Sequence, residues 1–218
     1  QQWGLVINMP YGDIRTVVLL SLIYDLGRKS SWCGETHVQK AGYFLQELCD
    51  VPMGFTFVLY KHGPFSFDLG DHINALRADG YLDLIPRFPV GPTVMVSVRG
   101  KDYIKAWSET IEQFRPRIEF VSTQLAGKEV VELERLATAL YVSKIVGFDK
   151  EAFVRASEIS RRRPHVTNEE AIRAVEELDN MVQALAAELA GRQSCAVEGE
   201  SNIILPGRRR KPGPGGRR

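Results

Sequence analysis

The residues of this sequence that could do acid–base or metal chemistry are few and widely spaced. His62 stands directly before Gly63-Pro64, where an imidazole could act as a general base or bind a metal. Cys33 and His37 are four residues apart, but a zinc site usually takes four ligands from two closely spaced pairs. The sequence has no second Cys or His pair, so we expect no metal site and no cofactor.

Motifs for nucleophilic catalysis and phosphate binding are also absent from the sequence. It contains no Gly-x-Ser-x-Gly elbow and no Gly-rich phosphate loop. Adjacent acids such as Glu169-Glu170 fall where a helix is expected to start. We interpret His62 as a side chain that packs beneath a turn as an aromatic ring would, and we expect a protein that is not an enzyme.

Composition restricts the class of protein further. Of 218 residues, 44% are hydrophobic and 25% are charged, as is typical of soluble globular proteins. The longest apolar run falls well short of the roughly 18 residues that a membrane-spanning helix needs. Three cysteines without a pairing rhythm indicate reduced thiols, so we expect a cytoplasmic protein with no membrane contact.

Charge is divided unequally between the body of the chain and its end. The net charge is +1, but the stretch after residue 206 holds six basic residues and no acid. The first 206 residues therefore carry 22 basic against 27 acidic groups, a net charge of −5. We expect a disordered basic tail over 192–218, because it cannot bury apolar surface. Its cluster could contact nucleic acid non-specifically through four residues: Arg208, Arg209, Arg210 and Lys211.

Apolar periodicity in the first third predicts two helices and a strand. A helix over 14–26 is expected to be capped by Asp13 and ended by Gly27. The next helix is expected to begin at Thr36, with Gln39 completing a capping box. The aromatic and β-branched run "GFTFVLY" then predicts a strand over 54–60, which ends before the Gly-Pro pair.

A third helix and a β-hairpin are expected after this turn. Ser66 can cap the helix and Gly80 can end it. The alternating segments "YLDLI" and "TVMVSV" predict two strands joined by a Pro/Gly loop. Helix, helix, strand, helix and hairpin is the order of a winged helix-turn-helix with a β-hairpin wing. We therefore predict an α+β fold, mainly α, with a winged-helix domain over 1–108.

Helical patterns fill most of the remaining chain. One is interrupted at Pro116, and a strongly apolar one covers 128–146. A capping box of Thr167 and Glu170 opens the last helix. The sequence predicts a helical region over 109–191 that either packs on the first domain or forms a homodimer. Its narrow apolar seam consists of Ile172, Val175, Leu178, Val182, Leu185 and Leu189.

Several of these segments resemble a known family. "THVQKAGYF" (36–44), "YKHGPFSFDL" (60–69) and "INALRADGYLDL" (73–84) are similar to successive motifs of the SocA-like, or Panacea, antitoxin domain. "ERLATALYVSK" (134–144) and "RPHVTNEEAIRAVEEL" (163–178) look more like the YwgA-like uncharacterised bacterial proteins. The sequence departs from the family pattern at His37, Gly42, His62 and Phe67.

The resemblance implies a prokaryotic, mostly helical protein without known catalytic residues. Panacea domains are associated with neutralising toxins by direct binding, and SocA is associated with delivering its toxin to a protease. What the resemblance implies is therefore a protein-interaction module, antitoxin-like or a protease adapter, whose partner is a protein such as a toxin.

Candidate partner-binding residues cluster at the turn and on the third helix. Three aromatic side chains crowd one turn, so they cannot all point inward, and an exposed ring would serve as an anchor. Gly63, Pro64 and Ser66 are expected to set the geometry of the turn. The predicted partner-binding set is Tyr60, His62, Phe65, Phe67, Asp71, Asn74 and Arg77.

A winged-helix DNA-binding transcription regulator is the alternative. In such proteins the third helix enters the major groove with basic or amide side chains. The outward positions expected here are Asp68, Gly70, Asp71, Asn74, Arg77 and Ala78. Two carboxylates near the helix start would face phosphates or base edges, and the acidic body would repel DNA. The sequence therefore favours a protein partner.

Overall fold

The structure, a computed structural model, describes residues 11–29, 32–88 and 91–200, with side chains over 14–29, 32–88 and 91–191. The fold is α+β and mainly helical, with two small antiparallel hairpins. The described residues up to Val182 form one compact unit and those from Gln183 form a second. A domain boundary at residue 108 stays a prediction. No helix within the described ranges combines the length and the apolar character needed to cross a membrane.

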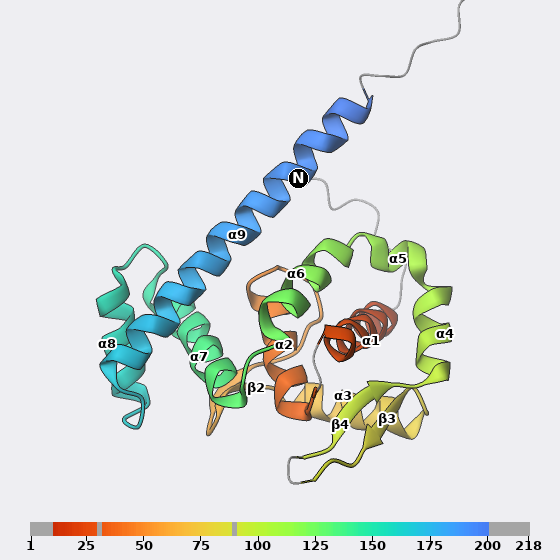
Figure 1. The fold of residues 1–218 in the computed structure, drawn as a ribbon, viewed down its shortest axis with the longest axis horizontal. Helices are drawn as coiled ribbons and strands as arrows, with labels where there is room; N and C mark the ends of the chain where they lie inside the picture. The colour runs from red at the N-terminus through yellow and green to blue at the C-terminus, as the bar shows by residue number, and fades with distance from the viewer. Residues whose placement is uncertain (1–10, 30–31, 89–90, 201–218) are drawn as a thin grey trace, which may run out of the picture. The chain divides into compact units, whose positions relative to one another are not determined.

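The first helix, α1 (Tyr11–Lys29), is the centre of the core. Its residues from Val17 to Leu20 are fully buried, since other helices surround it on several sides (Figure 1). Asp13 lies inside the helix and Gly27 does not end it, so both predicted boundaries are wrong. The last turn persists because Lys29 Nζ donates hydrogen bonds to two hydroxyl groups on α6 (Arg115–Leu125), the helix packed beside it.

The second helix, α2 (Glu35–Glu47), begins without a side-chain cap. Gly34 is its N-cap residue, and the predicted capping box of Thr36 and Gln39 is wrong. The side chain of Gln39 is instead fully buried and bonded to the backbone of Ser66. A tertiary contact therefore replaces the local one that the sequence pattern suggested.

A short hairpin follows, made of β1 (Val58–Tyr60) and β2 (Gly63–Phe65). Tyr60 pairs with Gly63, so Lys61 and His62 form a two-residue tip. The predicted strand over 54–60 is shorter than expected, because the backbone of Phe55 pairs with the side-chain amide of Gln46. The Gly-Pro pair does not stop a strand but begins one.

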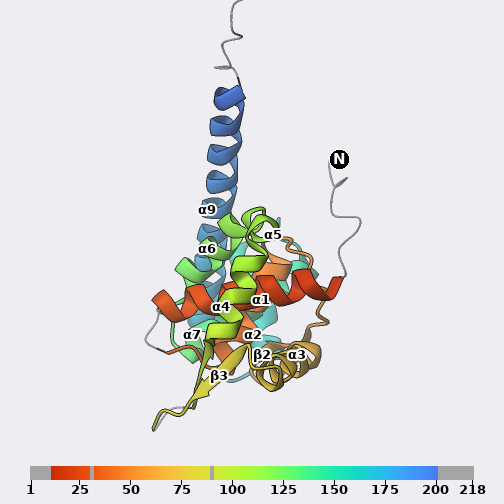
Figure 2. The same ribbon diagram turned by 90° about the vertical axis from the view of Figure 1, so that its right-hand side faces the viewer.

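The third helix and second hairpin agree with the predictions. Ser66 caps α3 (Phe67–Ala78) through a hydrogen bond from Leu69 N–H to its Oγ. Gly80 follows the helix with φ +75°, a conformation that favours glycine. Strands β3 (Leu82–Ile85) and β4 (Thr93–Val96) are antiparallel and extend beyond the neighbouring helices (Figure 2).

Three short helices occupy the segment in which one interrupted helix was predicted. Pro116 lies in the first turn of the third of them, where its missing N–H costs nothing. Breaks at Trp107 and Phe114 separate the three helices. They are α4 (Val98–Ala106), α5 (Ser108–Glu112) and α6 (Arg115–Leu125).

The last three helices are α7 (Val130–Val146), α8 (Ala152–Arg162) and α9 (Asn168–Glu200). Helix α7 packs against α2 and α8 and is buried, as predicted, whereas α8 was not predicted. The capping box of Thr167 and Glu170 is confirmed by hydrogen bonds of 3.0 and 3.3 Å.

The end of α9 and its buried face differ from the predictions. The helix continues to Glu200, so the prediction of disorder is wrong for 192–200, a stretch without proline. The basic cluster Arg208 to Lys211 lies outside the described residues. In the first unit, Val175 and Leu178 of the predicted seam are buried, but Ile172 and Val182 are only half-buried. The helix is rotated so that Ala171, Ala174 and Met181 are buried instead.

Candidate functional site

Two consecutive residues of α2 hold the β1–β2 hairpin in place. Gln39 Nε2 donates to Ser66 O at 2.9 Å, and Ser66 N–H donates to Gln39 Oε1 at 3.0 Å. Lys40 Nζ donates to Pro64 O at 2.8 Å. Both side chains are at most 1% exposed, so these bonds are shielded from water and fix the outer side of β2.

The hairpin also packs closely against α7. Gly63 has φ +83°, and a Cβ added there would lie 3.2 Å from both Glu134 O and Thr138 Oγ1. Gly63 therefore meets two requirements that only glycine satisfies easily, a left-handed backbone and a close approach. These contacts explain why a glycine stands in the turn that was predicted from Gly63, Pro64 and Ser66.

Lys40 is a buried cation that the sequence analysis did not identify. Its pKa is lowered to about 8, mainly by burial; the charge of Glu134 opposes this effect and the charge of Arg163 adds to it. Because every residue from His37 to Leu45 is buried, helical periodicity gave no sign that this lysine would be inside.

The aromatic side chains at the turn form one exposed cluster, which we call the aromatic surface: Tyr60, Phe65 and Phe67. Their ring centroids are 5.1–6.0 Å apart and the rings are tilted or edge-on to one another. Tyr60 is 54% exposed and Phe67 is 58% exposed, whereas Phe65 is half-buried beneath them. The structure therefore places the three rings together, and two of them face solvent.

The two outer edges of this hairpin differ. Tyr60 and Gly63 flank a two-residue tip, so they form a hydrogen-bonded pair. The next pair, Leu59 and Pro64, is therefore a non-hydrogen-bonded pair, and its backbone groups point away from the hairpin. On the β2 edge, Lys40 bonds to the carbonyl of Pro64, which has no N–H, and Gln39 bonds to both backbone groups of Ser66 just after the strand. On the β1 edge, no residue in the described ranges bonds to the N–H or C=O of Leu59. We call the β2 edge closed, because the outward carbonyl of Pro64 is bonded, and the β1 edge open, because the outward groups of Leu59 have no partner among the described residues.

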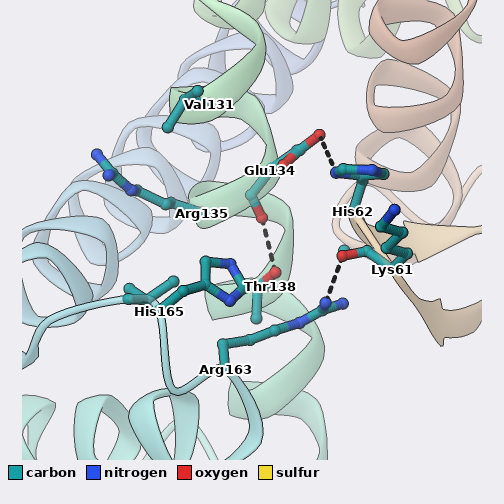
Figure 3. A pocket seen from close by; sticks show the side chains of 10 residues that line it. Lys61, His62, Val131, Glu134, Arg135, Thr138, Arg163 and His165 are labelled. Atoms are coloured by element: carbon teal, nitrogen blue, oxygen red, sulfur yellow. Dashed lines mark hydrogen bonds and ion pairs between the residues drawn. The ribbon is translucent and has the colours of Figure 1, made fainter.

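A cavity of about 260 Å³ lies beside the hairpin tip (Figure 3), and we call it the tip pocket. His62 approaches α7 from the hairpin, while Arg163 and His165 reach in from the segment between α8 and α9 (Figure 3). The cavity is also lined by Lys61, Val131, Glu134, Thr138 and Val166.

Polar contacts around the tip pocket join the hairpin to distant segments. His62 Nδ1 lies 3.3 Å from Glu134 Oε1, and Arg163 donates to the carbonyls of Lys61, at 2.6 Å, and of Tyr60. Burial lowers the pKa of Arg163. The His62 side chain is 62% exposed, so the prediction that it packs beneath the turn is wrong. Its position at the tip of a two-residue loop directs it outward.

Three further predicted residues lie along α3 after Phe67. Asp71, Asn74 and Arg77 are exposed, and Arg77 Nη1 donates to Asn74 Oδ1 at 3.1 Å. Asn74 and Arg77 line a cavity of about 320 Å³ that also includes residues of the β3–β4 hairpin. Gly70 is buried against α2, so its predicted outward position is wrong.

A further cavity of about 290 Å³ connects His62 to the aromatic surface. It is lined by Tyr60 and Phe65 on the hairpin and by Glu35 and Lys40 on α2. His62 lines this cavity as well as the tip pocket. The hairpin thus lines two cavities, and sequence reasoning predicted the aromatic cluster but neither cavity.

Cys33 and His37, which were considered for metal binding, are both buried. The ring Nε2 of His37 donates to Leu125 O at 2.8 Å, and burial raises the pKa of the Cys33 thiol to about 12. Over the part of the chain with described side chains, no three His, Cys, Asp or Glu residues are close enough together to hold a metal ion.

Comparisons with protein-family models and with curated proteins find no match to this chain. The resemblance to the Panacea domain, which depends on short motifs, therefore stays a prediction.

Proposed function

We propose that this protein is a non-enzymatic, cytoplasmic module that binds a partner protein through the aromatic surface. The observation that carries the proposal is that Tyr60 on the hairpin and Phe67 at the start of α3 are 54% and 58% exposed, while buried side chains of α2 bond to the backbone between them. Large aromatic side chains dominate binding energy at protein interfaces. Rings that are already held in place lose little conformational freedom on binding, which favours affinity.

The open edge of β1 supports a particular binding mode. An extended segment of the partner could add alongside β1 and pair with the outward N–H and C=O of Leu59. Val58 and Tyr60, on alternate positions of this strand, are 42% and 54% exposed and would contact its side chains. The closed edge of β2 offers no such site, so the partner is expected to bind on one side only.

The chain order further suggests a winged helix-turn-helix, in which α2 and α3 form the helix pair and β3–β4 the wing. In a DNA-binding member α3 would lie in the major groove. The exposed residues at the start of α3 include Asp68 and Asp71, and the cavity beside it has one cation, Arg77, and one anion, Glu35. This charge pattern supports a protein partner rather than DNA. An antitoxin or adapter role would act by covering the partner's surface.

Photo-crosslinking in the host tests the proposal. A photoreactive phenylalanine analogue is placed at Phe67, which is 58% exposed, or at Phe153 of α8, which is 62% exposed and serves as the matched control. We expect one polypeptide to be captured at Phe67 and not at Phe153, and its capture to fall when Tyr60 is replaced by Ala. Equal capture at both positions, or capture insensitive to Tyr60→Ala, would refute the aromatic surface as the binding site.

A DNA mobility-shift assay distinguishes the proposed protein-binding role from the alternative, a DNA-binding transcription regulator. Full-length protein is compared with a variant in which Arg208 to Lys211 are all replaced by Ala. Salt-dependent, sequence-independent binding that disappears in the variant indicates contact through the basic cluster alone. Sequence-selective binding that the variant retains would favour a transcription regulator and would contradict our proposal.

A further inference from the structure

The tip pocket holds more cationic than anionic charge. Lys61 and Arg163 line it, and Lys40 lies directly behind the hairpin tip, 3.7 Å from the position of a Cβ on Gly63. Arg135 also lines the pocket but is paired with Glu170. The other three cations surround one carboxylate, Glu134, which leaves a local charge of +2 when Lys40 is protonated and the histidines are neutral. The first 206 residues carry a net charge of −5, so the charge around the pocket is opposite in sign to the net charge of these residues.

Glu134 is the one neighbouring acid that acts on Lys40 and Arg163, and it forms an ion pair with neither of them within the described residues. Arg163 donates to backbone carbonyls of the hairpin, and Lys40 donates to the carbonyl of Pro64. Carbonyl oxygens solvate a cation without neutralising it. Of the ion pairs formed within the described segments, none includes Lys40, Lys61 or Arg163. Burial lowers the pKa of both Lys40 and Arg163, and the charge of Glu134 opposes that effect without cancelling it.

Hydrogen-bond donors from separate parts of the chain meet at the same cavity. Lys61 and His62 come from the hairpin, and Arg163 and His165 come from the segment between α8 and α9 (Figure 3). The volume of about 260 Å³ compares with about 30 Å³ for one water molecule, so the pocket has room for more than a simple inorganic ion. Val131 and Val166 add apolar walls.

We propose that the tip pocket binds a small organic oxyanion, a carboxylate or phosphate joined to an apolar group. The oxyanion would supply the counter-charge that Lys61 and Arg163 lack, and the apolar group would contact Val131 and Val166. The inference does not rest on the proposed protein partner, because its test needs no partner.

Titrations of the full-length protein by ¹H–¹⁵N NMR test the proposal. Phenyl phosphate, benzoate and uncharged phenol are added separately in a phosphate-free buffer, with the ionic strength matched by sodium chloride. We expect saturable shifts of the amides of Lys61, His62 and Val166 with one or both anions and not with phenol. The anion that binds more tightly identifies the oxyanion as phosphate or carboxylate.

Three single substitutions check the assignment. Lys61 and His165 are exposed, so Lys61→Ala and His165→Ala should leave the fold intact and each weaken binding, by up to about fivefold. Lys105→Ala removes an exposed cation on α4 and should leave the affinity unchanged. Shifts that do not saturate, shifts that phenol produces equally, or an equal loss in Lys105→Ala would each overturn the proposal. Retained affinity in both pocket variants would do the same.

Discussion

Replacing Gln39 with Ala should destabilise the chain and release the β1–β2 hairpin. Gln39 has no exposed surface, and its amide bonds to both the N–H and the C=O of Ser66. Ser66 is itself fully buried, so truncation leaves its N–H without a partner or access to water, whereas its C=O keeps the hydrogen bond from Gly70 N–H. An unsatisfied buried group costs about 1–3 kcal/mol and the C=O loses one of its two bonds, so we expect the free energy of unfolding to fall by about 2–3 kcal/mol.

Gln46 provides a matched control on the same helix. Its amide makes the same two bonds to the backbone of Phe55, both 2.8 Å long, but the side chain is half-buried. Water can replace those bonds in Gln46→Ala, so we expect a loss of only about 1 kcal/mol. Gln39→Glu keeps the size of the side chain but replaces the donor with an oxygen facing Ser66 O, so it should cost nearly as much as Gln39→Ala.

Urea unfolding followed by far-UV circular dichroism measures these free energies. Hydrogen exchange at the amide of Ser66 reports the hairpin separately, and exchange there should accelerate in Gln39→Ala but not in Gln46→Ala. The reasoning is refuted if Gln39→Ala costs no more than Gln46→Ala, or if the Ser66 amide stays equally protected.

Three further predictions concern close contacts and buried charge. Gly63→Ala should lower the free energy of unfolding by about 1 kcal/mol more than Gly80→Ala in urea, since both have positive φ but only Gly63 meets neighbouring atoms at 3.2 Å. Asp179→Ala should lower the free energy of unfolding by about 3 kcal/mol, measured by thermal unfolding, because it leaves the charge of Arg155, which is only 3% exposed, unpaired. Arg155→Met should lower it by less, and a larger loss in Arg155→Met would contradict this reasoning. Burial lowers the pKa of Lys40 from 10.5 to about 8, so the unfolded chain binds more protons between these values and stability should rise with pH there. Urea unfolding across this range should show that rise in the wild type but not in Lys40→Met.

Elements with local signals could be predicted from the sequence. The cap at Ser66, the capping box at Thr167 and the β3–β4 hairpin each depend on residues a few positions apart, and the structure contains all three. Gln39 shows where such reasoning fails. The Thr-x-x-Gln pattern fits a capping box, but the amide finds a buried partner 27 residues away, and the sequence does not reveal that competition.

The candidate site was predictable in part for the same reason. Crowding of Tyr60, Phe65 and Phe67 within eight residues made an exposed ring foreseeable. The tip pocket was not foreseeable, because α7 and the segment around Arg163 contribute to it from about 70–100 positions further along the chain. Helix α8, which precedes that segment, was missed although its buried residues Arg155, Ala156 and Ile159 have helical spacing, because one of the three is an arginine and a search for apolar residues passes over it.

The two proposed sites share one strand, and this restricts how they can influence each other. The backbone of β2 is held by Gln39 and Lys40, so it has little freedom to move. In β1 the Tyr60 ring belongs to the aromatic surface, while the Tyr60 carbonyl accepts a hydrogen bond from Arg163 of the tip pocket. An oxyanion that shifts Arg163 therefore changes a contact to the strand that presents Tyr60. If both sites bind as proposed, any coupling between them passes through β1, and it must be reciprocal: a partner that orders β1 changes oxyanion affinity by the same factor.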